Sequence, residues 1–254
     1  MNTAQQRAWL GSGAVFVAFI ALWWTTSHAG WISRVFLPTP EATTESLREG
    51  LAAGGDLAAF ALATTLRMLQ GWLLASLAGI GLGALIGISP SARSYLQPTL
   101  EFVRPLPASA LLPLAIAIFG LSPGMVLFVV AFGAMWPVLL ATVHGFAAVE
   151  PRLVEVARCL QLGRSAFVWK LGLPNALPDI LAGMRLSMTV SLIVSVVGEM
   201  IASQAGLGQA ILLAARSFRA SELFAGIVLL GVVGFASNAL LALAERKLLK
   251  WQSP

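Results

Sequence analysis

One polar passage holds the residues most able to do chemistry: EVARCLQLGRSAFVWKLGLPNALP, from Glu155 to Pro178. It carries four charged residues, two glycines and two prolines between two long apolar segments. No nucleophile with a neighbouring base, no phosphate-binding loop and no paired carboxylates accompany these charges. The passage therefore predicts a surface that another protein recognises. We expect that the chain is not an enzyme and contains no catalytic residue.

This passage is predicted to form two short helices. The first opens at Glu150-Pro151, because proline is favoured in the first turn and an acid suits the positive end of the helix dipole. Helical spacing places apolar and charged side chains on opposite faces. The apolar residues are Leu153, Val156, Ala157 and Leu160, and the charged ones are Arg152, Glu155 and Arg158. The first helix is expected to end at Gly163, and the second, 166–172, to stop at Leu173-Pro174. Helices this short are marginal in water, which implies a docking partner.

The surrounding elements follow from an apolar composition. Of 254 residues, 58% are hydrophobic and 11% charged, and the mean hydropathy is +0.85, which is typical of an integral membrane protein. A crossing helix needs about 20 apolar residues, and long stretches almost free of charge supply them. The sequence predicts an all-α membrane protein with a cytoplasmic loop at 146–180 and six transmembrane helices, at 10–27, 69–89, 104–120, 124–144, 182–203 and 223–244.

Glycines and prolines modulate these predicted helices. Gly79, Gly83 and Gly87 recur every four residues and predict a smooth stripe on which another helix packs closely. Pro105, Pro107, Pro113 and Pro137 are expected to kink the third and fourth helices.

The distribution of Lys and Arg predicts the orientation. With the N-terminus inside, eleven of the 16 cations, Arg104 among them, fall in cytoplasmic segments. Both termini and the polar passage are then cytoplasmic, and the net charge of +5 reflects topology rather than affinity for nucleic acid. The first helix also imitates a signal peptide, with small residues at Ser27-His28-Ala29, but Trp23-Trp24 favour an interfacial anchor and predict that the helix is retained.

A few polar residues lie within or beside the apolar helices. Glu199 is the one acid inside them, so it is either a gate or docking residue or the acceptor of a structural hydrogen bond. Ser191 and Ser195 either line a polar pathway or serve helix packing. His28 and His144 lack further ligands at metal spacing, so no metal site is predicted.

Four groups of residues spread over the chain identify a family. Glu155-Val156-Ala157-Arg158 is followed, after a fixed gap, by Leu171-Gly172-Leu173-Pro174, which is similar to the EAA loop of permease subunits of binding-protein-dependent ABC importers. Three further motifs are similar to the nitrate, sulfonate, taurine and bicarbonate branch. They are Phe36-Leu37-Pro38-Thr39-Pro40, Arg104-Pro105-Leu106-Pro107, and Glu199-Met200-Ile201-Ala202 with Gly206-Leu207-Gly208. The resemblance covers nearly the whole chain.

This resemblance implies one permease domain over 1–254 with the type I ABC importer fold. It implies three protein partners: a second copy of the permease, a cytoplasmic ABC ATPase dimer and a periplasmic or lipoprotein substrate-binding protein. ATP and Mg would be bound by the ATPase, and this chain would hold no cofactor. The location implied is the bacterial inner membrane, among lipids, and the solute is a small oxyanion or sulfonate such as nitrate, taurine or an alkanesulfonate.

In such permeases the loop forms a coupling helix that sits in a cleft of the ATPase. The resemblance implies that the residues that couple this chain to the ATPase are Glu155, Ala157, Arg158, Gln161, Gly163, Leu173 and Pro174. Two positions depart from the pattern: Val156 stands where alanine is usual, and Gln161 where glycine is usual. Gly163 is the alternative residue for the turn.

The rival class is an ion-coupled secondary transporter. Such a protein is expected to show internal repeats and buried ionisable residues near the membrane midplane. Only Glu199 meets the second condition, and no twofold repeat is visible in the sequence.

Overall fold

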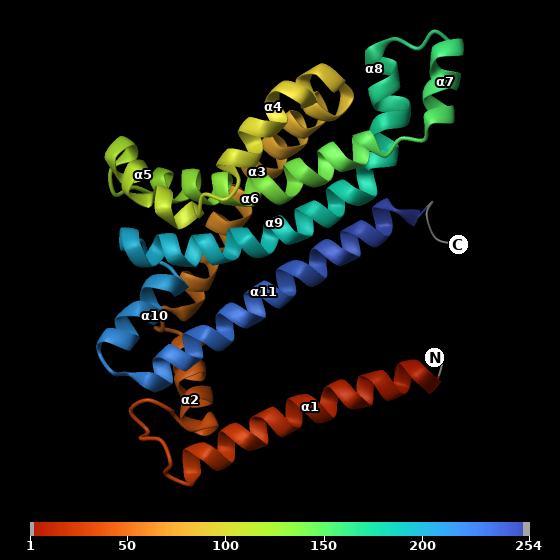
Figure 1. The fold of residues 1–254 in the computed structure, drawn as a ribbon. Coiled ribbons are helices and arrows are strands. Elements are labelled where there is room, and N and C mark those ends of the chain that lie inside the picture. The colour runs from red at the N-terminus through yellow and green to blue at the C-terminus, as the bar shows by residue number, and fades with distance from the viewer. Residues whose placement is uncertain (1–2, 251–254) are drawn as a thin grey trace.

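The computed structural model of the protein describes residues 3–250, and the ordered elements within this range are all helices (Figure 1). The predicted domain, 1–254, therefore extends beyond the described residues at both ends. In chain order the elements are α1 (Thr3–His28), α2 (Pro40–Leu51), α3 (Leu57–Ile88), α4 (Pro90–Val103), η1 (Ala108–Leu111), α5 (Leu112–Phe119), α6 (Pro123–Ala147), α7 (Pro151–Cys159), α8 (Arg164–Phe167), η2 (Val168–Gly172), α9 (Leu173–Ala202), α10 (Leu207–Arg216) and α11 (Ala220–Leu248).

The core lies where α3, α6 and α9 pack against one another, and small residues allow their close approach. A Cβ added at Gly79 would lie 2.9 Å from the Cβ of Val138, and one added at Gly83 would lie 2.6 Å from the Cβ of Thr142. The predicted glycine stripe is therefore confirmed as the surface of α3 that packs on α6. Figure 1 shows α7 and α8 at one end of the bundle and α2 and α10 at the opposite end, while α1 stands apart.

Fewer helices meet the length and hydropathy of a membrane span than the six predicted. Within residues 3–250, four helical stretches do so: α3, α6, α11, and the continuous stretch Ser165–Ala202. A fifth span results if the bent pair of α4 and the η1–α5 segment is counted as one. α1 is not among these candidates, although its apolar side chains are exposed, as at Val15, Phe16 and Phe19.

The prediction of one helix over 104–120 is wrong, because this span is broken rather than merely kinked. α4 ends at Val103, and the two halves, Ser91–Val103 and Ala108–Phe119, meet at an angle of 83°. Pro105 and Pro107 lack the amide hydrogen that would continue the helix, and Pro107 is extended, with ψ of 129°. Pro137, by contrast, lies within the unbroken helix α6.

The predicted stop at Leu173-Pro174 is also wrong. The chain is helical from Ser165 to Ala202 without a gap, so the fifth predicted span, 182–203, begins much earlier. The wide turn of η2 makes this possible, since the amide of Leu173 bonds to the carbonyl of Val168, five residues back. Such a π-type turn gives the ring of Pro174 room beside the preceding turn.

Candidate functional site

The helix α7 presents an apolar face that nothing in the described chain covers. Leu153, Val156 and Leu160 are 39%, 52% and 66% exposed, whereas Ala157 is buried. Pro151 begins this helix after Glu150, as the sequence predicts. An exposed apolar stripe on a helix of nine residues indicates a binding surface for another protein.

Charged side chains on α7 are free to meet a partner. Glu155 and Arg158 are exposed, and Glu155 forms no ion pair or hydrogen bond with any residue that the structure describes. Arg152 lies 4.0 Å from Glu150 instead. An ion pair between Glu155 and either Arg152 or Arg158 is therefore absent from this structure.

The turn after α7 is built on Gln161. Its φ is +50°, the left-handed region in which glycine is favoured. The amide of Gln161 bonds to the carbonyl of Arg158 at 3.0 Å, and that of Leu162 bonds to Ala157 at 2.9 Å, which is the Schellman pattern of a helix end. Gly163 is exposed and is not among the residues with positive φ, so Gln161, not Gly163, supplies the turn.

The loop beyond this turn is fastened to the core. A Cβ added at Gly145 would lie 2.7 Å from the Cα of Ala176, and the side-chain amide of Asn175 donates to the carbonyl of Gly145 at 3.1 Å. Leu173 packs against the buried cluster that includes Phe146, while Pro174 stays exposed. The segments α8, η2 and α9 form one continuous helix, so the α7–α8 loop is joined to α9 without a break.

At the opposite end of α9, Glu199 is fully buried within a network of donors. Thr64 donates to its carboxylate at 3.0 Å, the amide of Gly208 donates at 2.9 Å, and Arg67 forms an ion pair with it. The hydroxyl of Thr64 also accepts a bond of 2.9 Å from the amide of Leu207. Glu199 and Thr64 together satisfy the first amides of α10, as a capping residue does. These contacts are those of a structural acceptor.

The same network explains why the motif Gly206-Leu207-Gly208 contains two glycines. A Cβ at Gly206 would lie 2.6 Å from one carboxylate oxygen of Glu199, and one at Gly208 would lie 3.0 Å from the other. Sequence reasoning missed Thr64 and Arg67, which are 135 and 132 residues distant from Glu199 along the chain. No local pattern links such positions.

Ser191 and Ser195 are fully buried on α9. Ser187, one turn before Ser191, donates to the carbonyl of Ala134 on α6 at 2.7 Å, whereas the hydroxyls of Ser191 and Ser195 have no partner among the described residues. This position within the bundle is that of small packing residues. Neither serine, nor Glu199, lines the groove described next.

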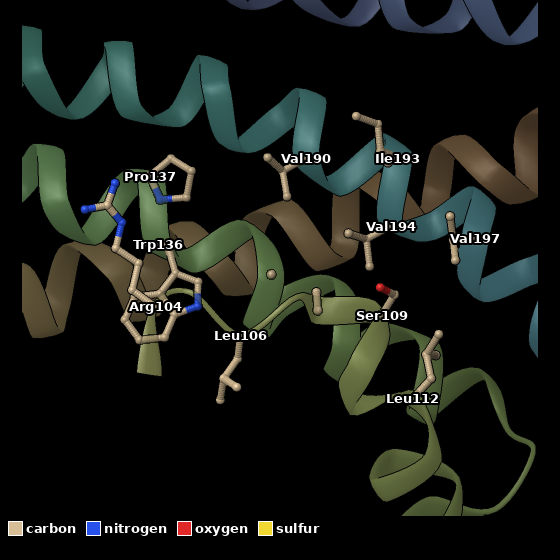
Figure 2. Close-up of a pocket in the computed structure, with 12 residues that line it drawn as sticks. Arg104, Leu106, Ser109, Leu112, Trp136, Pro137, Val190, Ile193, Val194 and Val197 are labelled. Atoms are coloured by element: carbon tan, nitrogen blue, oxygen red, sulfur yellow. The ribbon is translucent and has the colours of Figure 1, made fainter. Parts of the chain in front are cut away.

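A groove runs along the face where the broken span meets α6 and α9 (Figure 2). One part, of about 380 Å³, is lined by Arg104, Leu106, Ala108, Ser109, Leu112, Gly133, Trp136, Pro137, Val190, Ile193, Val194 and Val197. A second part, of about 480 Å³, shares Arg104, Trp136 and Pro137 with the first and extends to His144 and Asp179. The two parts therefore adjoin one another along α6, from Gly133 to His144.

Arg104 occupies a particular place in the fold. It stands at the break in the span, beside Trp136 and Pro137 near the middle of α6. The signal that could have revealed this was the motif itself, an arginine between a helix end and two prolines. The charged groups at the α7 end of the groove, His144 and Asp179, are 3.5 Å apart.

These features define a class of protein before any comparison. A bundle of long apolar helices with a lateral groove, and with an uncovered amphipathic helix at one end, is the architecture of a multi-pass membrane protein that offers a surface to a partner. Within the described residues no group of three or more His, Cys, Asp or Glu side chains could hold a metal ion.

The chain belongs to the family of binding-protein-dependent transport system inner membrane components, whose sequence profile matches residues 75–250. It is 34% identical over 249 residues to the putative aliphatic sulfonates transport permease protein SsuC of Bacillus subtilis, covering 98% of this chain and 90% of the relative. It is 30% identical over 236 residues to the taurine transport system permease protein TauC of Escherichia coli, covering 91% and 86%. It is thus a multi-pass inner-membrane permease component of an ABC transporter and not the ATPase.

The fold is similar to that of a solved importer. A chain of the MetNI methionine ABC transporter in an inward-facing conformation matches with a TM-score of 0.65 at 18% identity, covering 78% of this chain and 96% of that one. The all-helical architecture is therefore that of type I ABC importer permeases. Membership of this family brings an ATPase and a binding protein as partners, and the nucleotide is bound by the ATPase.

Proposed function

We propose that this chain is the permease subunit of an ATP-driven importer for a small oxyanion or sulfonate, such as nitrate, taurine or an alkanesulfonate. Two copies enclose the pathway. An ABC ATPase dimer, which binds ATP and Mg, docks on the cytoplasmic side, and a periplasmic or lipoprotein binding protein delivers the solute outside.

The observation that carries this proposal is the uncovered face of α7, joined through a tight turn to the long helix α9. In the proposed complex Leu153, Val156 and Leu160 fill an apolar cleft of the ATPase, while Glu155 and Arg158 pair with its charges. Closure of the ATPase dimer then moves α7, and the fastened loop passes this displacement to α9. Rigid elements that shift as units are the usual carriers of such motion.

The other coupling residues have separate roles in this proposal. Ala157 faces the bundle and keeps α7 close to it, and Gln161 sets the direction in which the chain leaves α7. Gly163 begins the return toward the membrane. Leu173 fixes the base of α9 in the core, and Pro174 is exposed beside it.

A second copy is required because one chain supplies a single coupling helix, whereas the ATPase works as a dimer. The groove supports this arrangement, since residues on its rim remain exposed in one chain. Leu106 is 46% and Ile193 58% exposed. A partner placed over this face would enclose the groove.

We further propose six spans with both termini in the cytoplasm, α1 being the first span. The exposed apolar surface of α1 suits lipid contact. Its far end is held by two tryptophans: the indole of Trp23 donates to the carbonyl of Pro38 at 2.9 Å, and that of Trp24 to Glu41 at 2.9 Å. These bonds fix α1 beside α2, at the end of the bundle opposite α7.

The substrate class is supported by the relatives named for aliphatic sulfonates and taurine. The choice among such anions falls largely to the binding protein in this proposal. The ion-coupled alternative would need a buried acid that is free to bind the coupling ion. Among the residues whose burial the structure describes, Glu199 is the one buried acid, and it is paired with Arg67 and bonded to the first turn of α10.

The test is uptake of radiolabelled taurine or nitrate by proteoliposomes that contain the permease, its ATPase and its binding protein. The proposal predicts uptake that needs ATP on the ATPase side and persists with ionophores. Uptake that collapses with ionophores and ignores ATP would establish the secondary transporter instead.

A further inference from the structure

The groove contains one charged residue with no counter-charge. Arg104 lines both parts of the groove, and it forms no ion pair or hydrogen bond through its side chain with any residue in 3–250. Glu101 lines an adjoining hollow together with Arg104 and Trp136, but it forms no ion pair with Arg104 and accepts a hydrogen bond from Gln97 at 2.7 Å. At the inner end of the groove, His144 lies beside its own acid, Asp179, at 3.5 Å.

The position of Arg104 is unusual for a charge. It stands at the 83° break in a candidate membrane span, beside Trp136 and Pro137 of α6. A charge at this depth is costly, and it is normally found facing a water-filled cavity or a ligand. Broken helices near the midplane are also where transporters build their binding sites.

A second donor lies next to the same place. The residue Trp136 is 8% exposed and lines both parts of the groove beside Arg104, and its indole nitrogen is buried without a hydrogen-bond partner in the described structure. Buried donors are rarely left unpaired. Figure 2 shows Arg104 and Trp136 at one end of the groove and the hydroxyl of Ser109 further along it, directed toward α9.

These groups share one chemistry. The guanidinium of arginine is always charged and presents several N–H donors in a plane, and the indole N–H is a donor only. The remaining lining of the part that holds Ser109 is apolar, and in the other part the carboxylate of Asp179 is paired with His144. Such a set matches a small anion with several acceptor oxygens and offers little to a cation.

We infer that Arg104 and Trp136 form the anion-contacting point of the translocation groove, through which a sulfonate or other oxyanion passes after release from the binding protein. The inference rests on the proposed function. It makes Arg104 a specificity-determining residue of the permease itself, in addition to the selection made by the binding protein.

The experiment uses the assembled complex in proteoliposomes, with radiolabelled taurine and nitrate as probes and with ATP hydrolysis followed in parallel. The variants are Arg104→Gln, Arg104→Lys and Trp136→Phe. Arg246→Gln is the matched control, because Arg246 is an exposed cation on α11 that lines neither the groove nor the hollow beside it that Arg104 shares with Glu101. Assembly of each complex is checked by size-exclusion chromatography.

We expect Arg104→Gln to lower uptake about tenfold or more, which is the cost of one charge-assisted hydrogen bond, while ATP hydrolysis stimulated by the loaded binding protein continues. Arg104→Lys should retain most of the uptake, because the charge remains. Trp136→Phe should lower uptake about fivefold, which is the cost of one neutral hydrogen bond. Arg246→Gln should match the wild type.

The two proposals fail differently. Normal uptake by Arg104→Gln in a complex whose wild type transports would overturn the inference alone. Equal losses of uptake, assembly and ATP hydrolysis in both Arg104→Gln and Arg104→Lys would also overturn it, since they would make Arg104 a structural residue. Absence of ATP-dependent uptake by the wild type would overturn the proposed function as well.

Discussion

Breaking the ion pair between Arg67 and Glu199 from one side is predicted to be among the most destabilising single substitutions in the permease. The side chain of Arg67 is 14% exposed and that of Glu199 is fully buried. Removing one member of such a pair strands the other charge, at a cost of about 3–5 kcal/mol. Arg67→Met should therefore destabilise the protein by this amount, which corresponds to a fall of about 10 °C in the unfolding temperature.

The two residues should also be coupled in a double-mutant cycle. In Arg67→Met with Glu199→Gln, an uncharged amide replaces the stranded carboxylate and can still accept from the amide of Gly208. The double variant should therefore cost about 2 kcal/mol less than the sum of the single variants. The assay is thermal unfolding of the detergent-solubilised complex, followed by intrinsic tryptophan fluorescence.

A matched control lies on the surface. Arg219 pairs with Glu222 at 2.9 Å, but both side chains are about half exposed, at 54% and 48%. Exposed pairs contribute only about 0–1 kcal/mol, so Arg219→Met should change the unfolding temperature little. Equal effects of Arg67→Met and Arg219→Met, or simple additivity at Arg67 and Glu199, would refute the structural role assigned to the buried pair.

Three further predictions concern the coupling loop and the bundle. Gln161→Gly should stabilise the turn after α7 by about 1 kcal/mol, because glycine adopts positive φ without strain, and hydrogen exchange of the 158–163 amides should slow; faster exchange would contradict it. Gly83→Val should destabilise the α3–α6 contact by about 1–3 kcal/mol, whereas Gly81→Val, which meets nothing within 4 Å, serves as the control. Glu155→Lys should lower uptake about tenfold or more through a repelled docking charge, with an unchanged unfolding temperature; wild-type uptake and wild-type stimulated ATP hydrolysis would refute the coupling role.

Local chemistry explains what could be predicted from the sequence. The apolar stretches require helices in lipid, and the spacing of Leu153, Val156 and Leu160 specifies one face of α7 whatever the rest of the chain does. The glycine stripe on α3 could be predicted in the same way, because a small residue at every fourth position of an apolar helix indicates close packing against another helix. Gln161 was identified as a departure from the family pattern, and the structure shows that it adopts the backbone conformation that glycine favours.

The features that the sequence did not predict are of two kinds. Some are contacts between distant segments, and others are prolines at which a helix can either break or continue. Pro105 and Pro174 both interrupt a helix pattern, yet the chain breaks near the first and continues through the second by a π-type turn. The outcome depends on what packs beside each proline. The partners of Glu199 could not be predicted, because Thr64 and Arg67 meet it only when α3 and α9 are packed together.

The single cysteine of the chain, Cys159, allows the most direct test of the central claim, that α7 docks into an ATPase. It is exposed on α7, one turn after Glu155. The measurement is the rate at which a maleimide labels Cys159 in the permease alone and in the assembled complex with its ATPase. The account predicts rapid labelling of the permease alone and strong protection in the complex, whereas equal rates in both would contradict it.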